Sequence, residues 1–300
     1  MPTHSHAAFL PLAVRSALAQ RGVSVELFVI GDGVEDDTRA ALEPLLGDPR
    51  VRFFDRPKGE RHGERHRHDA LQEASGEIVC YLCDDDLLLP DHVATMKELL
   101  AAADFAHGAP LYVATDGSLV CLPLDLALPR FVDHLNARRA SFGLTGAAHT
   151  LEAYRRLPHG WHPAPPDIWT DLHMWQQFLA LPGLRGVTGV RLTHLHFPSP
   201  YRSDWTDARR VAELEQWAGR LAEPSFRAEL DELAAVAIRR AAIEHRFWAL
   251  DLEERVAGLE RGSADEALAA LLATRTFRLR ERLLRVGVLR RLLARSPAAR

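Results

Sequence analysis

The sequence predicts an α/β fold, with a mostly parallel sheet flanked by helices and a helical C-terminal extension. In the first hundred residues, short apolar runs typical of strands alternate with segments of helical periodicity, and such alternation implies crossovers between parallel strands. Helix-forming residues then dominate from Thr206 onward. The composition, 47% apolar and 26% charged over 300 residues, indicates a globular protein with a sizeable core and excludes disordered and collagen-like chains.

Apolar periodicity locates the elements of the first hundred residues, and glycine, proline and capping residues bound them. The first helix, for example, has Pro11 near its start and Gly22 just past its end. Pro44 lies late enough in the second helix to kink or shorten it. The expected elements, in order, are a helix over 9–20, a strand over 25–30, a helix over 38–46, a strand over 51–54, a helix ending near 74, a strand over 77–83 and a helix over 93–103.

The character of the sequence changes twice after the first hundred residues. The pair Asp116-Gly117 lies between two short apolar runs and predicts a β-hairpin over 111–122. Short strands and helices then mix, around a loop rich in proline and tryptophan, until helix formers take over. We therefore expect three segments, with boundaries at 1–108, 109–205 and 206–300.

Charge is distributed unevenly along the chain. The formal charge is −4 overall, but nine arginines and one glutamate give residues 275–300 a charge of +8 and leave −12 for the rest. Over 276–294, leucines and a valine recur on one helical face among arginines, which predicts a basic amphipathic helix able to lie on anionic lipid. Packing of this helix on the acidic body and a dimer contact are the alternatives. Nucleic-acid binding is not expected, because the body is acidic and the tail has Phe277 as its one aromatic residue.

Targeting features favour the cytoplasm. No run approaches the roughly 18 to 20 apolar residues of a membrane-spanning helix. The first residues carry no basic region before a short apolar patch, which is unlike a signal peptide. We therefore expect a cytoplasmic protein, with peripheral contact to the inner face of the membrane through 276–294. The three cysteines, Cys80, Cys83 and Cys121, form a poor disulfide framework and fit reduced thiols.

Three adjacent aspartates, Asp84, Asp85 and Asp86, follow the strand predicted over 77–83. In a parallel sheet the carboxyl ends of strands meet at one edge, where ligands bind, and Asp32 lies at the end of an earlier strand. Adjacent carboxylates repel one another and raise one another's pKa unless a cation compensates. Oxygen ligands suit Mg²⁺ or Mn²⁺, which bind one or two protein carboxylates together with substrate phosphates. The alternative is a solvated loop in which one aspartate caps the next helix.

Several short motifs surround these aspartates. They are Pro2-Thr3-His4-Ser5-His6, the strand over 25–30 with Gly31-Asp32-Gly33, Asp36-Asp37-Thr38, His68-Asp69-Ala70, the segment 74–86 and Leu89-Pro90-Asp91. In this order and spacing, over the first hundred residues, the chain resembles family 2 glycosyltransferases of the GT-A fold. Two departures from the family pattern are Gly31-Asp32-Gly33-Val34, where Asp-Asp-Gly-Ser is common, and His68-Asp69, where Arg-Asn is common.

The resemblance implies a GT-A fold that binds a nucleoside-diphosphate sugar, with UDP as the favoured nucleotide. Residues 1–108 would bind this donor, and residues 109–205 would bind the acceptor, a glycan or a lipid-linked acceptor. The roles that the resemblance implies are Pro2, Thr3 and Asp32 at the base, Arg65 and Arg67 at the nucleotide, Asp84 at the ribose, and Asp85 and Asp86 at a metal ion, Mn²⁺ or Mg²⁺.

The second half supplies the remaining candidates. The segment 166–175 resembles the one in which this family carries its catalytic carboxylate, so Asp171 is the candidate base for an inverting transfer, with Asp167 in reserve. Asp171 can instead cap the helix that follows it. In this fold a histidine at the position of His196 can complete the metal site, and the alternative for His196 is a structural role. Arg202 is a candidate for closing over the diphosphate.

The leading prediction is therefore a metal-dependent, inverting glycosyltransferase. A sugar-phosphate nucleotidyltransferase is one alternative, but it would require a glycine-rich phosphate loop after its first strand, and residues 2–8 contain no glycine. A catalytically degenerate GT-A-like binding module is the other. It is favoured because Pro2-Thr3 would follow a strand that the sequence does not show, and disfavoured because the aspartate cluster and Asp171 are both present.

Overall fold

The computed structural model describes residues 1–261 with the exception of residue 123. The chain divides into two compact units, Met1–Arg239 and Arg240–Arg300, and every candidate site residue lies in the first. The predicted amphipathic helix over 276–294 lies outside the described residues. The segment boundaries expected at 108 and 205 stay predictions.

The first sheet is parallel throughout and has the strand order β1-β2-β3. Strand β1 is short, and its two residues pair with Ile30 and Gly31 of β2, whereas β2 and β3 pair over their full lengths. Pro2-Thr3 is thus itself a strand rather than a loop that follows one. The strands are β1 (Pro2–Thr3), β2 (Leu27–Asp32) and β3 (Val51–Arg56).

A second, mixed sheet has the strand order β10-β6-β9-β4. Strand β10 pairs with β6 in parallel, and β9 is antiparallel to both of its neighbours. Two further strand pairs are antiparallel, β5 with β11 and the hairpin β7 with β8, and the hairpin confirms the turn predicted at Asp116-Gly117. These strands are β4 (Ile78–Cys80), β5 (Leu87–Leu88), β6 (Phe105–His107), β7 (Leu111–Val113), β8 (Leu119–Cys121), β9 (Ala147–Thr150), β10 (Gly186–Thr188) and β11 (His194–Leu195).

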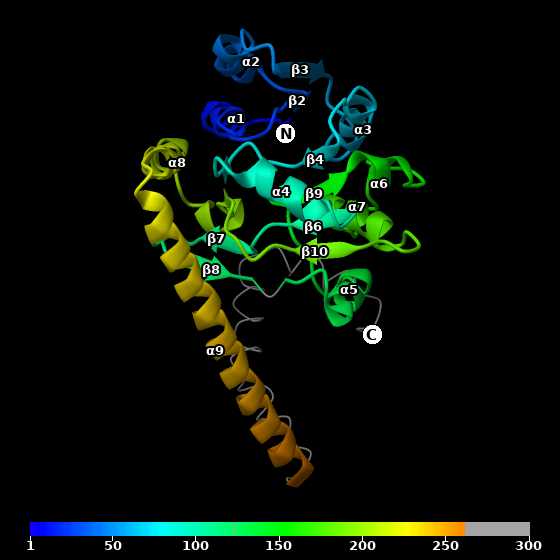
Figure 1. The fold of residues 1–300 in the computed structure, drawn as a ribbon, viewed down its shortest axis with the longest axis vertical. Helices are drawn as coiled ribbons and strands as arrows, with labels where there is room; N and C mark the ends of the chain where they lie inside the picture. The colour runs from blue at the N-terminus through cyan, green and yellow to red at the C-terminus, as the bar shows by residue number, and fades with distance from the viewer. Residues whose placement is uncertain (123, 262–300) are drawn as a thin grey trace, which may run out of the picture. The chain divides into compact units, whose positions relative to one another are not determined.

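The helices cover both faces of these sheets (Figure 1). The second predicted helix is shortened as expected, because α2 ends at Leu42 and Pro44 lies in the 3₁₀ turn η1 that follows. The helices are α1 (Leu10–Leu18), α2 (Asp36–Leu42), η1 (Glu43–Leu45), α3 (Glu64–Gln72), α4 (His92–Leu100), α5 (Pro129–Asn136), α6 (Leu151–Arg155), α7 (Thr170–Leu179), η2 (Ser199–Arg202), α8 (Asp207–Ala222) and α9 (Phe226–Arg261).

The core follows from the alternation of side chains along β2. Val29 packs with α1 and α2, whereas Phe28 and Ile30 point to the other face, where Ala70 of α3 lies. The second sheet is covered in the same way, with Met96 of α4 on one face and α7 packed against the other. Strands buried on both faces are apolar throughout, which is why these runs were recognisable in the sequence. The α/β fold with flanking helices and a helix-rich C-terminal region is confirmed.

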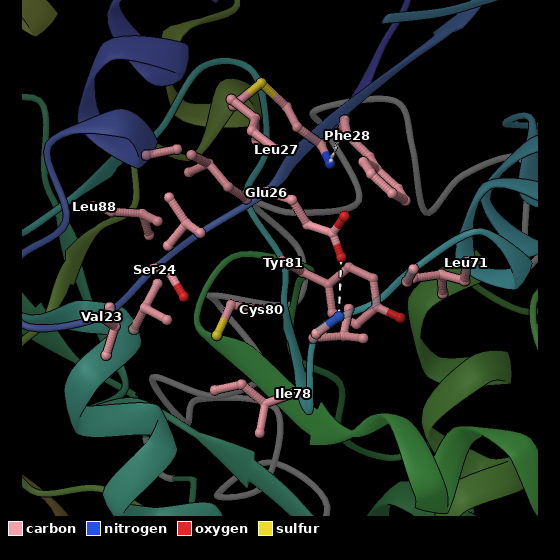
Figure 2. A pocket seen from close by; sticks show the side chains of 18 of the residues that line it. Val23, Ser24, Glu26, Leu27, Phe28, Leu71, Ile78, Cys80, Tyr81 and Leu88 are labelled. Carbon is pink, nitrogen blue, oxygen red and sulfur yellow. Dashed lines mark hydrogen bonds between the residues drawn. The ribbon is translucent and has the colours of Figure 1, made fainter. Parts of the chain in front are cut away.

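Two further features bear on function. None of the described helices is long and apolar enough to cross a membrane. A cavity of about 810 Å³ lies between β2 and β4, lined by residues of both strands and of α3 (Figure 2). Asp32, Asp171 and the three adjacent aspartates do not line this cavity.

Candidate active site

The three adjacent aspartates lie in the turn between β4 and β5 and are almost fully buried. The turn closes because the N–H of Asp86 returns to the carbonyl of Cys83, at 3.4 Å. Three buried neighbouring anions cost free energy unless donors or cations compensate them. Their partners therefore define the site.

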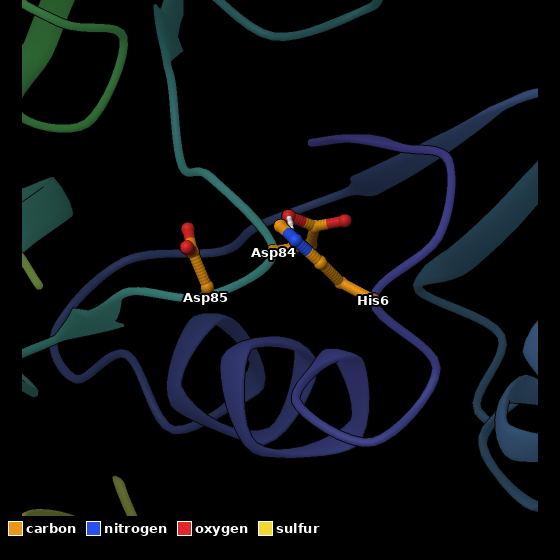
Figure 3. A group of neighbouring side chains, drawn as sticks. All are labelled: His6, Asp84 and Asp85. Carbon is orange, nitrogen blue, oxygen red and sulfur yellow. Dashed lines mark hydrogen bonds and ion pairs between the residues drawn. The ribbon is translucent and has the colours of Figure 1, made fainter. Parts of the chain in front are cut away.

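Asp84, which follows β4 of the second sheet, is paired with a histidine that follows β1 of the first sheet. The loop after β1 brings the Nδ1 atom of His6 to 2.8 Å from Oδ1 of Asp84, and the two side chains point toward each other (Figure 3). The hydrogen bond to Asp84 raises the pKa of His6 above its ordinary value. His6 was part of a recognised sequence motif, but the sequence did not indicate that it would face the cluster.

Asp85 has partners from the C-terminal part of the first unit. Its Oδ2 atom accepts hydrogen bonds from the Ser199 hydroxyl at 2.6 Å and from Arg210 of α8 at 2.8 Å. Burial raises the pKa of Asp85, and the negative charges of Asp86 and Asp84 raise it further. Asp85 is therefore a buried carboxylate with an excess of negative charge around it.

Asp86 is fully buried, and its carboxylate is hydrogen-bonded to residues from two other segments of the chain. It accepts hydrogen bonds from the backbone N–H of Phe197 at 2.8 Å and from the hydroxyl of Thr145. Nδ1 of His196 lies 2.9 Å from its Oδ2 atom. Burial disfavours the charged imidazole of His196, but the adjacent Asp86 outweighs this effect and raises its pKa. Because Nδ1 donates to Asp86, the Nε2 atom of His196 is left as a potential ligand, an arrangement typical of metal-binding histidines.

The residue types around Asp85 fit a hard divalent cation. One ligand atom each from His6, Asp84 and Asp85 lie within 4.8 Å of one another, and the same holds for Cys83, Asp85 and Asp86. Burial and the nearby Asp86 and Asp85 raise the pKa of the Cys83 thiol well above its ordinary value, so this thiol stays protonated. The carboxylates are left as the available anionic ligands, and oxygen ligands favour Mg²⁺ or Mn²⁺.

Asp32 lies at the end of β2, where the sequence predicted it, and the loop before α3 surrounds its carboxylate. The N–H of Gly59 donates to it at 2.6 Å, and the ammonium group of Lys58 also donates to it. Burial alone would raise the pKa of Asp32, but these two donors outweigh burial and lower it. Gly63 has φ +68°, and a Cβ atom there would lie 2.7 Å from Cγ of Asp32. Only glycine fits this contact.

The other two residues predicted at the base, Pro2 and Thr3, form β1 beside Asp32. Thr3 is buried, and its hydroxyl has no hydrogen-bond partner among the described residues.

The two arginines predicted near the nucleotide point in different directions. Arg65 has a side chain that is 70% exposed and donates to Asp69 at 3.0 Å, one helical turn away. Arg67 is buried, with its guanidinium 4.5 Å from the ring centroid of Trp161 and one hydrogen bond of 2.8 Å to the carbonyl of His62. Its Nε and Nη1 atoms have no partner within the described part of the chain. The structure thus directs Arg67, and not Arg65, into the interior.

Asp171 lies in the first turn of α7, and its position depends on a contact between two helix N-termini. Thr170 donates to the buried carboxylate of Glu64, in the first turn of α3, at 2.8 Å. Burial raises the pKa of Asp171, and the positive charges of Arg67 and His62 oppose this shift. The contact between Thr170 and Glu64 therefore holds Asp171 close enough to Arg67 for the positive charge to act on its pKa. Glu64, which lies 106 positions from Thr170, is not among the residues that the sequence predicted at the site.

The reserve candidate for the base, Asp167, and the candidate for closing over the diphosphate, Arg202, are both paired with other residues. Asp167 is exposed and forms an ion pair with Arg138 at 2.7 Å. Arg202 is fully buried and forms two hydrogen bonds of 2.6 Å to Glu213 of α8. Arg202 therefore stabilises the packing of α8 in this structure.

A buried network of hydrogen bonds fixes the Trp161 ring on which Arg67 packs. The indole N–H of Trp161 donates to the hydroxyl of Tyr81 at 2.8 Å, and this hydroxyl lies 2.8 Å from Nε2 of His149. The Nδ1 atom of His149 lies 2.9 Å from the carbonyl of Thr150, so it carries the proton and Nε2 accepts from Tyr81. Each polar side-chain atom of Trp161, Tyr81 and His149 is paired in this series of hydrogen bonds, so the indole on which Arg67 packs is held in one orientation.

Curated relatives match part of the chain. A β-1,3-glucosyltransferase of Campylobacter jejuni, named for the acceptor GalNAc(5)-diNAcBac-PP-undecaprenol, is 30% identical over 108 residues, 36% of this chain and 35% of that protein. The succinoglycan biosynthesis protein ExoO of Rhizobium meliloti is 34% identical over 134 residues, 40% of this chain and 37% of that protein. The chain thus spans little more than a third of the length of these relatives.

Solved structures match more of the chain. S. aureus TarS in complex with UDP-GlcNAc has a TM-score of 0.53 at 13% identity and covers 80% of this chain and 70% of its own. The mannosyltransferase PcManGT from Pyrobaculum calidifontis, in complex with GDP-Man and Mn²⁺, has a TM-score of 0.51 at 18% identity and covers 98% of this chain and 86% of its own. At such identities the likeness shows the fold, which is the expected GT-A fold.

The family itself is shown by sequence. The model of the family described as "Glycosyl transferase family 2" matches residues 1–158, more than half of the chain. This stretch contains β1, β2 and the aspartate turn after β4. The resemblance drawn from the motifs is confirmed, and the chain belongs to glycosyl transferase family 2.

Proposed function

We propose that this protein is a metal-dependent, inverting glycosyltransferase that moves a sugar from a nucleoside-diphosphate sugar to an acceptor hydroxyl. The observation that carries the proposal is the convergence of a buried carboxylate cluster, the unpaired donors of Arg67 and the raised pKa of Asp171. Of the structural neighbours, TarS is described with UDP-GlcNAc and PcManGT with GDP-Man and Mn²⁺. UDP remains the favoured nucleotide, with Pro2, Thr3 and Asp32 at the base.

The cation would be held by Asp85 and by Nε2 of His196, and Asp84 would contact the ribose. Asp86 already accepts from three groups, so its main role would be to orient His196. A divalent cation at such a site supplies positive charge that stabilises the departing diphosphate. Arg67 would donate from its two unpaired nitrogen atoms, Nε and Nη1, to the same diphosphate.

Asp171 would act as the general base. Its carboxylate would take the proton of the acceptor hydroxyl as the acceptor oxygen bonds to the anomeric carbon and the bond from that carbon to the diphosphate oxygen breaks. Burial, which raises the pKa of Asp171, strengthens the carboxylate as a base. Attack from the face opposite the leaving group would invert the configuration at the anomeric carbon.

The acceptor would be a glycan or a lipid-linked glycan. The Campylobacter jejuni relative is named for an acceptor of the second kind, and ExoO for polysaccharide biosynthesis. Residues 109–205 would bind this acceptor, and the segment 276–294 would bring the protein to the membrane that carries it.

Binding measured by calorimetry tests the donor site. UDP, GDP and their sugar conjugates are titrated with Mn²⁺ and with a chelator, into the wild type, into Asp85→Asn and into the control Asp36→Asn, whose side chain is fully exposed. We expect metal-dependent binding of one nucleotide that is lost in Asp85→Asn and kept in the control. Nucleotide affinity that is the same with Mn²⁺ and with chelator, and the same in the wild type and in Asp85→Asn, would refute the proposed site.

Turnover then separates a transferase from a binding module. A preparation that binds the donor but transfers no sugar to any glycan or lipid-linked glycan tested would favour the degenerate module. Where transfer occurs, NMR of the product's anomeric configuration tests inversion.

A further inference from the structure

Trp169 is the most exposed tryptophan of the first unit. It is 64% exposed, whereas Trp161 and Trp175, the tryptophans on either side of it in the sequence, are fully buried. Within the described part of the chain its indole makes no hydrogen bond and no ring contact. Because a covered indole contributes a large apolar area, an exposed and unpartnered indole beside a reacting group indicates a surface that a ligand covers.

The backbone that carries this indole is fixed on both sides. On one side the carbonyl of Ile168 accepts a hydrogen bond from Nη2 of Arg61 at 3.3 Å. On the other side the hydroxyl of Thr170 donates to the buried carboxylate of Glu64 at 2.8 Å. The carbonyl of Trp169 itself accepts the backbone N–H one turn further along α7, at 2.9 Å. The main chain is therefore held while the indole is unpartnered, which is the arrangement of a preorganised binding surface.

These contacts place Trp169 where the proposed donor and acceptor parts of the site meet. Arg61 belongs to the loop before α3, and other residues of this loop donate to the carboxylate of Asp32. Glu64 is the first residue of α3. On the acceptor side, the proposed base Asp171 follows Trp169 by two positions. A ligand that covers the indole would therefore lie beside the group proposed to take the proton of the acceptor hydroxyl.

We infer that the Trp169 indole is the surface on which the acceptor stacks, and that the acceptor presents a pyranose ring there. This inference rests on the proposed function and names the chemical class that its acceptor site takes. The flat apolar face of an indole matches the C–H face of a pyranose, and the indole N–H can donate to a sugar hydroxyl. The stacked ring would carry the hydroxyl that Asp171 deprotonates.

The neighbours of this indole favour a sugar over a lipid chain. Asp167, two positions before Trp169, is exposed and forms an ion pair with Arg138 at 2.7 Å. A lipid chain is longer than one indole, so it would also cover neighbouring charged groups and remove their water, which costs free energy. Sugar hydroxyls would form hydrogen bonds with such groups while the C–H face of the ring covers the indole.

The test uses ¹⁹F NMR of the full chain labelled with 5-fluorotryptophan, in which the resonance that disappears in Trp169→Ala reports this indole. Di- and trisaccharides of glucose, galactose and their N-acetylated forms are titrated with and without UDP and Mn²⁺, and geranyl phosphate is the lipid probe. We expect at least one of these sugars to shift the Trp169 resonance. Covering one indole face removes roughly 60 Å² of apolar surface from water, so Trp169→Ala should weaken calorimetric binding of that sugar about tenfold.

Three controls separate stacking from a structural effect. Trp169→Phe keeps a flat apolar ring and should retain the sugar affinity within about threefold. Trp248→Ala removes an exposed tryptophan of α9 in the second unit and should leave the sugar affinity unchanged. Because the Trp169 indole has no partner among the described residues, Trp169→Ala should keep the Tm within about 2 °C and the UDP affinity within about twofold.

Two results would overturn the inference. One is that no sugar shifts the Trp169 resonance, or that the sugars bind the wild type and Trp169→Ala equally. The other is a shift caused by geranyl phosphate and by none of the sugars, which would assign the indole to a lipid chain. Failure of the proposed function has a different signature, because a protein that binds sugars through Trp169 but binds no nucleotide would refute the transferase and keep Trp169 as a sugar-binding residue.

Discussion

Replacing Arg67 by methionine separates binding from folding, because this buried guanidinium has two nitrogen atoms without a partner in the described part of the chain. Methionine keeps the apolar stem that packs on Trp161 and removes the charge. If Arg67 binds the diphosphate, the absence of its two unpaired donors weakens the variant only in nucleotide binding and not in folding.

The expected magnitudes differ for binding and for stability. Two hydrogen bonds to a charged group, at about 1.5 kcal/mol each, amount to about 3 kcal/mol, which is roughly 150-fold in the affinity for UDP. In the free protein the substitution removes one hydrogen bond to His62 and one cation–π contact with Trp161, worth about 2 kcal/mol together. It also relieves two buried unpaired donors, each costing about 1 to 3 kcal/mol. We therefore expect the free energy of unfolding to stay constant or to rise.

Calorimetric titration of UDP and thermal unfolding measure the two quantities, with Arg65→Met as the matched control. Arg65 is exposed and binds Asp69, so its replacement should leave affinity within about twofold. Loss of Arg67 also removes a charge that opposes the raised pKa of Asp171, so the acidic limb of the rate profile should move to higher pH. Unchanged affinity in Arg67→Met, or an equal loss in Arg65→Met, would refute the reasoning.

Three further predictions concern the base and its surroundings. Asp171→Asn should reduce transfer by about 10² to 10⁴-fold while nucleotide affinity changes less than about threefold, and transfer rates near those of the wild type would exclude this base. Thr170→Val leaves an oxygen of the buried Glu64 without its donor, so unfolding free energy should fall by about 1 to 3 kcal/mol and transfer should fall more than binding, whereas Thr170→Ser should preserve both. Burial lowers the pKa of His149 to about 4, so below its ordinary pKa of 6.5 the unfolded chain binds a proton that the folded protein does not. Stability should therefore fall by about 2 kcal/mol from this group between pH 7 and pH 5, and an identical pH dependence in His149→Gln would contradict this assignment.

The sequence was sufficient for the fold and for the location of the acidic cluster. Apolar runs located β2 and β4 in the sequence, although the predicted ends, at 30 and 83, differ from the observed ends at Asp32 and Cys80. Asp32 is the last residue of β2, and the three aspartates lie in the turn after β4, as expected. The helix-shortening effect of Pro44 and the turn at Asp116-Gly117 also depend on neighbouring residues alone, and both were correct.

The partners of these residues were decided by tertiary structure. Arg65 and Arg67 are two positions apart on one helix, and only the packing of α3 on Trp161 makes one exposed and the other buried. His6 meets Asp84 across 78 positions, and Arg210 meets Asp85 across 125. Asp171 owes its place to the contact between Thr170 and Glu64. Local periodicity determines which face of an element is apolar, whereas the charge that a buried group meets depends on which distant element covers that face, and a single sequence does not encode this in any local pattern.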